Sequence, residues 1–67
     1  MEYYEIQVGP NWTYYVSANE FAKLTGRSDR FAHVQTFRYD PSGHDKFTIG
    51  EEIHINPDWV VSARKMT

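Results

Sequence analysis

Apolar residues alternate with polar ones along two stretches near the start of the chain. The apolar positions are Tyr4, Ile6, Val8, Trp12, Tyr14 and Val16. Alternation with period two is typical of a strand that buries one face. The loop Gly9-Pro10-Asn11 lies between the two stretches, and a short loop of these residue types favours a hairpin. The sequence therefore predicts a hairpin over residues 4–16.

After this hairpin the apolar spacing changes to that of a helix. The residues at helical spacing are Ala18, Phe21, Ala22 and Leu24. Ser17 and Glu20 form a capping-box pattern, in which each side chain satisfies a free backbone N–H of the first turn. Gly26 is placed to end the helix. The pattern predicts a two-turn helix over residues 18–25, held against a sheet by its larger apolar side chains because so short a helix is unstable alone.

Residues 31–39 are rich in strand-forming types, and their apolar side chains fall on both faces. The residues concerned are Phe31, Ala32, Val34, Phe37 and Tyr39. A strand that is apolar on both faces is typical of a central position in a sheet, or of a strand with a bulge. Residues 40–45 form a turn by their types, and residues 46–49 are expected to pair back.

The stretch 47–63 combines two apolar pairs at spacing two with a second turn. The pairs are Phe47 with Ile49 and Ile53 with Ile55. We expect Gly50-Glu51 to interrupt the chain between them, with Glu52 and His54 facing solvent. Asn56-Pro57 predicts a tight turn or one 3₁₀ turn, because proline pushes the residue before it into an extended conformation. The predicted core of this stretch consists of Ile53, Ile55, Trp59 and Val60, and residues 60–63 form the last strand.

The segment "FTIGEEIHI", residues 47–55, resembles the strand, glycine turn and strand of SH3-like small β-barrels. The following Asn-Pro-x-x-Val-Val is similar to the short 3₁₀ turn that leads into their last strand. The resemblance covers residues 47–63 and implies a small barrel, but it carries no site, since such barrels host many functions. The early hairpin and capped helix do not belong to the simplest version of that fold. An open α+β sheet with one helix is therefore the alternative to a closed barrel.

Composition limits the kind of protein this is. Sixty-seven residues without cysteine predict a single small domain over residues 1–67 that has no disulfide and no thiolate metal site. Two Trp, five Tyr and four Phe residues favour a small aromatic core. No apolar run approaches a membrane span and the start shows no secretory signal, so we expect a cytoplasmic protein without membrane contact.

Three groups of residues in the sequence are of types suited to catalysis or ligand binding. The three histidines, His33, His44 and His54, have no metal-ligand spacing, although His33 and His54 are candidates for cross-strand neighbours. Glu51 and Glu52 are adjacent, and neighbouring strand residues point to opposite faces. No glycine belongs to a phosphate-binding loop. The sequence thus predicts no enzyme, no metal and no cofactor.

The charge pattern supplies the candidate binding residues. Basic residues gather in the segment 23–38, where aromatic residues lie between them. The charged residues in the segment 40–58 are mostly acidic. The candidate site consists of Arg27, Arg30, Arg38, Phe37 and Tyr39. Such a mixture of cations and aromatic rings stacks on nucleic-acid bases in some proteins, although the net charge of −2 argues against non-specific binding driven by phosphate contacts.

The sequence predicts a mainly β fold (α+β) of about five strands and one short helix in the order ββαβββ, as an SH3-like barrel or an open sheet. The expected function is a non-catalytic protein-binding module or accessory protein, of the kind typical of bacteria or phages. It would act through surface aromatic residues and a sheet edge, with a protein partner or a second copy. The alternative is a small nucleic-acid-binding barrel that uses the basic segment 23–38.

Overall fold

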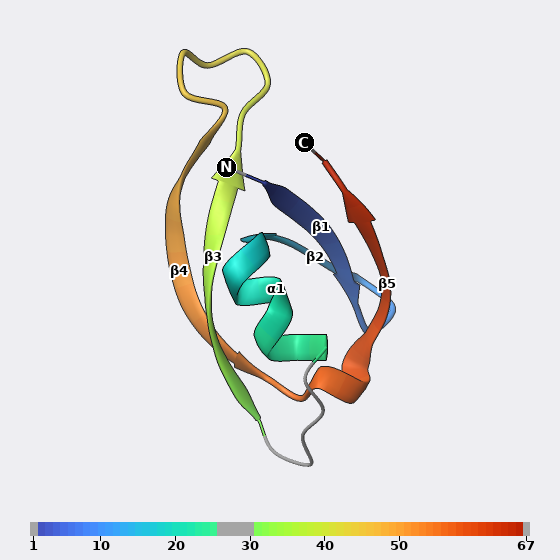
Figure 1. Ribbon diagram of the computed structural model, residues 1–67. Coiled ribbons are helices and arrows are strands. Elements are labelled where there is room, and N and C mark those ends of the chain that lie inside the picture. The colour runs from blue at the N-terminus through green and yellow to red at the C-terminus, as the bar shows by residue number, and fades with distance from the viewer. Residues whose placement is uncertain (1, 26–30, 67) are drawn as a thin grey trace.

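The computed structural model describes residues 2–25 and 31–66. The chain is mainly β, with five antiparallel strands in one open sheet and one short helix (Figure 1). The elements are β1 (Tyr3–Val8), β2 (Trp12–Ser17), α1 (Ala18–Thr25), β3 (Ala32–Tyr39), β4 (Phe47–Ile55), the 3₁₀ helix η1 (Pro57–Trp59) and β5 (Val60–Lys65). The predicted element order, the helix bounds and the 3₁₀ turn are confirmed.

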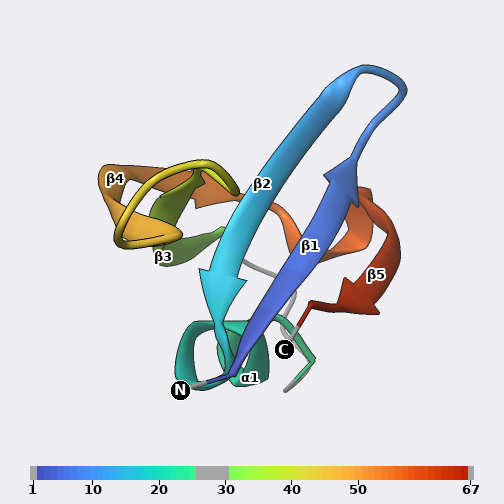
Figure 2. The same ribbon diagram turned by 90° about the horizontal axis from the view of Figure 1, so that it is seen from above.

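The strand order in the sheet is β4-β3-β2-β1-β5. Long ladders join β1 to β2 and β3 to β4, whereas β2 and β3 share only two paired positions in the described chain, Tyr15 with Phe37 and Val16 with Thr36. The two hairpins run in clearly different directions on either side of this short ladder (Figure 2). The sheet therefore has a concave face, over which α1 lies, and an outer face, with β4 and β5 as its two edges.

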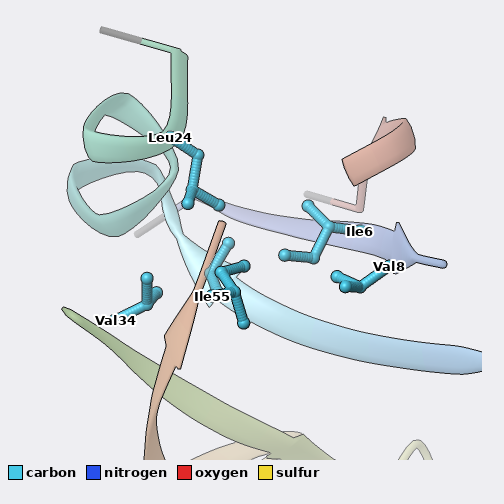
Figure 3. Close-up of a cluster of buried hydrophobic side chains, with 6 residues drawn as sticks. Ile6, Val8, Leu24, Val34 and Ile55 are labelled. Carbon is cyan, nitrogen blue, oxygen red and sulfur yellow. The ribbon is translucent and has the colours of Figure 1, made fainter. Parts of the chain in front are cut away.

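Six apolar side chains form the buried core of the described residues: Ile6, Val8, Val16, Leu24, Val34 and Ile55. They come from α1 and four strands and meet on the concave face (Figure 3). Phe21 packs against them and stacks on Tyr4, with ring centroids 4.3 Å apart, so the predicted docking of the helix is confirmed. Ile53 and Val60 are partly buried against the core. The placement of Trp59 in the core is wrong, because half of this side chain is exposed.

The helix begins at its predicted cap but not with the predicted reciprocal bond. The backbone N–H of Glu20 donates to Ser17 Oγ at 3.3 Å, which satisfies one free donor of the first turn. The Glu20 carboxylate accepts instead from the backbone N–H of Gln35 in β3 at 2.9 Å, and it pairs with Lys23 at 3.1 Å. Glu20 thus ties the helix to the sheet. The predicted terminator Gly26 lies outside the described residues.

The contact between Glu20 and β3 makes stability depend on pH. The N–H of Gln35, followed by Lys23, lowers the pKa of Glu20 below its ordinary value of 4.5, against the opposing effect of burial. A carboxyl whose pKa is lowered by folding stabilises the fold above its unfolded pKa, and this contribution is lost as the pH falls through the folded pKa. Glu20→Gln should therefore lower the melting temperature at neutral pH, and the gap should close well below pH 4.5.

Thermal melts of wild type and Glu20→Gln across this pH range measure the effect. Glu51→Gln is the control, because Glu51 is exposed and its carboxylate makes no hydrogen bond or ion pair with any described residue. If the difference in melting temperature between Glu20→Gln and wild type stayed constant from neutral to acid pH, the stabilising role given to the Glu20 carboxylate would be wrong.

A bulge in β4 decides which of its side chains face the core. Between the pairs Phe37–Ile49 and Gln35–Glu52, β3 advances two residues while β4 advances three. The sequence predicts an interruption at Gly50-Glu51, and this is wrong: the strand continues through both residues. One extra residue reverses the alternation beyond it. Phe47 and Ile49 therefore lie on the outer face, and the apolar pair after the bulge lies on the core face.

Side chains of β3 hold the bulge in place. Gln35 Nε2 donates to the backbone carbonyl of Gly50 at 2.9 Å and to that of Thr36 at 2.9 Å. The buried Thr36 hydroxyl donates to the backbone carbonyl of Glu51. These bonds satisfy carbonyl groups that the interrupted ladder would otherwise leave without a partner. The bulge is thus fixed at one position along the strand.

Candidate functional site

The residues predicted as a binding site do not form one surface in the described chain. Arg27 and Arg30 lie outside the described residues. Phe37 and Tyr39 point to the outer face, whereas Arg38 lies between them in β3 and points to the other face. Lys23, the remaining base of the basic segment, is paired with Glu20. The described part of the segment therefore brings no cation beside the two rings.

Phe37 and Tyr39 belong instead to an aromatic cluster on the outer face. Its members are Tyr3, Tyr15, Phe37, Tyr39 and Phe47. Tyr3 stacks on Phe47 with centroids 3.9 Å apart, and Tyr39 stacks on Phe47 at 4.9 Å. Offset and edge contacts of this kind stabilise the rings against one another. The cluster therefore forms a second, smaller apolar layer, in which much of the surface of each ring contacts the other rings of the cluster.

Beside this cluster, a polar chain crosses three strands. The Tyr15 hydroxyl donates to Glu5 Oε2 at 3.3 Å, and Arg64 Nη2 lies 3.1 Å from the other oxygen of Glu5. Burial, together with the negative charge of Glu5, raises the pKa of Tyr15 above its ordinary value. The arrangement joins β2, β1 and β5 across the outer face and has the character of a structural link.

Two histidines meet on the same face at the far end of β3 and β4. His33 and His54 are paired across the strands, as the sequence allowed, and their rings stack with centroids 4.6 Å apart. His33 Nε2 lies 2.7 Å from Glu52 Oε1. Within residues 2–25 and 31–66, no group of three His, Cys, Asp or Glu side chains is placed to hold a metal ion. This trio is exposed and acts as a polar cross-strand contact.

A large apolar groove lies at the open end of the concave face. Its volume is about 610 Å³. Its walls come from the tip of the β1–β2 hairpin, the end of β4 and η1. The lining residues are Val8, Gly9, Pro10, Trp12, Tyr14, Ile53, His54, Ile55 and Trp59. Hollows of this size with mostly apolar and aromatic walls are typical of binding sites. We call it the Trp groove.

Local backbone chemistry fixes the two rims of the Trp groove. Gly9 has φ of 60° at the hairpin tip, a conformation that glycine adopts without strain. Its N–H donates to the backbone carbonyl of Trp59 at 2.9 Å, which joins the hairpin tip to η1. Asn56 Oδ1 caps η1 by accepting from the N–H of Asp58 at 2.9 Å. The rim that carries Trp59 is therefore anchored by these two hydrogen bonds.

Aromatic side chains stand exposed on both rims. Trp12 is 62% exposed and stacks loosely on Tyr14, while Trp59 is 50% exposed and meets the exposed ring of Phe31 edge-on at 5.6 Å. Val8 and Ile55 belong both to the buried core and to the groove lining. The Trp groove is thus an uncovered continuation of the core rather than a separate cavity.

Sequence reasoning missed the Trp groove although it identified most of its parts. The alternation places Trp12 on the same face as Val16, and the Asn-Pro turn brings Trp59 toward that face. Both facts indicate a core position. The sequence contains one signal that could have indicated exposure. Two tryptophans fall on one face of the sheet, and a helix of eight residues is too short to cover the whole of that face.

Both edge strands of the sheet are irregular, and one of them ends with charged residues. β4 carries the bulge at Gly50-Glu51, and β5 has a register shift that leaves Val61 without a partner in β1. Arg64 and Lys65 end β5 with charge. Bulges and charged side chains on edge strands discourage the addition of another strand. The Trp groove is therefore the stronger candidate site.

Comparisons with known proteins add no relative to this picture. No protein-family model, curated protein or solved structure matches the chain. In the described ranges no helix has the length and apolar character needed to cross a membrane. Function must therefore be inferred from the chemistry of the surface itself.

Proposed function

We propose that this protein is a non-catalytic binding module whose Trp groove accepts apolar side chains of a partner protein. The observation that carries the proposal is the exposure of Trp12 and Trp59 on either rim of one apolar groove. Exposed apolar surface that is gathered in one place is typical of an interaction site, whereas single exposed apolar residues are not informative. Tryptophan is also among the residues that contribute most to binding energy in protein interfaces.

The chemistry of the Trp groove supports binding rather than catalysis. The lining of the groove includes two titratable residues, Tyr14 and His54, no hydrogen bond joins their side chains within the described residues, and the rest of the lining is apolar or aromatic. General acid–base or nucleophilic catalysis needs at least two cooperating groups within hydrogen-bond reach. The stacked neighbour of His54 is His33, on the outer face of the sheet. We therefore assign the groove the role of holding a ligand.

The likeness to SH3-like small barrels remains part of this proposal. It is supported by the 3₁₀ turn Pro57–Trp59, which leads directly into the last strand, β5. In the proposal, Asn56 and Pro57 serve a second purpose, because the turn that starts β5 also presents Trp59 to the partner. An accessory role in the cytoplasm fits a small module that acts through one such surface.

Trp59→Ala should weaken the binding of peptides by about thirtyfold or more without unfolding the protein. The reason is that a central aromatic anchor contributes about 2 kcal/mol or more, while its exposed half contributes little to the core. The test selects short peptides against the wild type by display and then measures their affinity for wild type and variant by fluorescence polarisation. Melting temperature is measured in parallel.

Ile49→Ala is the matched control, because Ile49 is 66% exposed and lies on the outer face. It removes a comparable exposed apolar side chain away from the Trp groove. Selected peptides that bind Trp59→Ala as tightly as wild type would refute the proposal. Salt-sensitive binding of single-stranded DNA that Trp59→Ala leaves unchanged would favour the alternative function, nucleic-acid binding by the segment 23–38.

A further inference from the structure

We propose that the segment held by the Trp groove is basic: an extended stretch of a partner protein with apolar side chains and a flanking lysine or arginine. The inference rests on the proposed function and adds the charge class of the partner. Three observations carry it, namely the sign of the charge around the groove, the size of the exposed surface, and the continuity of the groove with the core.

The charged residues that adjoin the groove in sequence are acidic. Within two positions of any lining residue, the chain carries Glu51, Glu52 and Asp58 and no lysine or arginine. Glu52 lies on the outer face beside His33, which leaves Glu51 and Asp58 as the acids of the groove end. Asp58 precedes the rim residue Trp59 and is exposed, and its carboxylate makes no ion pair with any described residue. An exposed negative charge beside a binding surface attracts cations and speeds the encounter.

The described bases elsewhere are largely neutralised by acids of the same chain. Lys23 pairs with Glu20, Arg64 with Glu5 and Lys65 with Glu2, with distances between 3.1 and 3.3 Å. Arg38 and Lys46 lie toward the β3–β4 turn, at the other end of β4 from Ile55. The acidic character of the groove end is therefore not offset by a neighbouring base in the part of the chain that the structure describes.

The amount of exposed surface favours a short segment over a second copy of the chain. The accessible surface is 4683 Å², and a monomer of 7.9 kDa is expected to expose about 4,400 Å². The two values are close, whereas a stable interface needs roughly 800 Å² from each partner. The groove is of a size that a few side chains fill, which is less surface than a stable dimer buries on each partner.

The shared residues of groove and core couple binding to folding. Val8 and Ile55 are each 5% exposed and line the groove floor. An occupant that covers them extends the core, and a ligand that binds only the folded chain stabilises it by RT ln(1 + L/Kd), where L is the free ligand concentration. A groove ligand should therefore raise the melting temperature of the wild type, and it should raise the melting temperature less in a variant that binds it more weakly.

The test uses three synthetic versions of the tightest peptide obtained by selection. Their apolar residues are kept, and the flanking positions are lysine, glutamine or glutamate. We expect affinity for the wild type to fall in that order at low salt and the differences to shrink as salt is added. Asp58→Asn should reduce the advantage of lysine over glutamine about two- to fivefold, the range of an exposed ion pair.

Asp45→Asn is the control, because Asp45 is exposed in the β3–β4 turn away from the groove. It removes the same charge and should leave the lysine preference unchanged. The lysine peptide should also raise the melting temperature of the wild type and not that of Trp59→Ala. Together these results would establish a groove that selects a basic apolar segment.

Other outcomes overturn the inference in distinguishable ways. If the three peptides bind the wild type equally, or the glutamate version binds best, while all depend on Trp59, the binding module stands and the basic partner is wrong. If none depends on Trp59, the proposed function fails as well. Sedimentation that shows a dimer in the wild type and a monomer in Trp59→Ala would assign the groove to a second copy and refute the partner segment.

Discussion

Ile55→Ala is expected to cost about 2 to 5 kcal/mol of unfolding free energy, the range for removing a buried aliphatic side chain from a packed core. Ile55 is 5% exposed and packs within the cluster that joins α1 to four strands. A domain of this size has a total stability of only a few kcal/mol. The variant should therefore be largely unfolded at room temperature, as circular dichroism and thermal melts would show.

The matched control for this change is again Ile49→Ala, in the same strand. A strand without a bulge would place Ile49 and Ile55 on one face, because both have the same parity. The bulge at Gly50-Glu51 separates them, and Ile49 is 66% exposed. Ile49→Ala should shift the unfolding free energy by no more than about 0.5 kcal/mol. Equal destabilisation by the two substitutions would mean that β4 has no bulge and that the core is assigned wrongly.

Gly50→Val should destabilise the fold by about 1 to 3 kcal/mol through crowding at the bulge. A Cβ at this position would lie 3.0 Å from Thr36 Oγ1 and 3.3 Å from the backbone carbonyl oxygen of Thr36. The Thr36 hydroxyl is held by its bond to the carbonyl of Glu51, so it cannot move aside without losing that bond. Valine adds two further carbons. Chemical denaturation of both proteins measures the loss.

Thr48→Val tests whether valine itself is the cause. Thr48 is an exposed residue of the same strand, paired with Arg38, and valine is a good strand former. This control should therefore unfold within about 0.5 kcal/mol of the wild type. A Gly50→Val protein that is as stable as the Thr48→Val protein would show that the space between β4 and Thr36 is wider than the structure has it.

The core and the candidate site share side chains, because Val8 and Ile55 belong to both. α1 covers one end of the concave face, and its eight residues leave the other end to the Trp groove. The open end leaves apolar surface uncovered, as proteins commonly do where a partner supplies the missing contact.

Local chemistry determined much of this protein before any packing is considered. The alternation of apolar and polar residues predicts the first hairpin, Ser17 predicts the start of α1, and Asn56-Pro57 predicts the 3₁₀ turn. Each of these features depends on residues within a few positions of one another, so the sequence suffices to predict them. The predicted element order was correct for the same reason.

The tertiary structure decided on which face of the sheet each side chain lies and which hydrogen-bond partner each polar group has. A single extra residue at Gly50-Glu51 reverses the alternation in β4, and only the partner strand β3 reveals it. Glu20 bonds to Gln35 rather than back to its own helix, because folding brings β3 within reach. The exposure of Trp59 depends on how far the helix and hairpins cover the concave face. Such outcomes depend on contacts between residues distant in the chain, which no local pattern records.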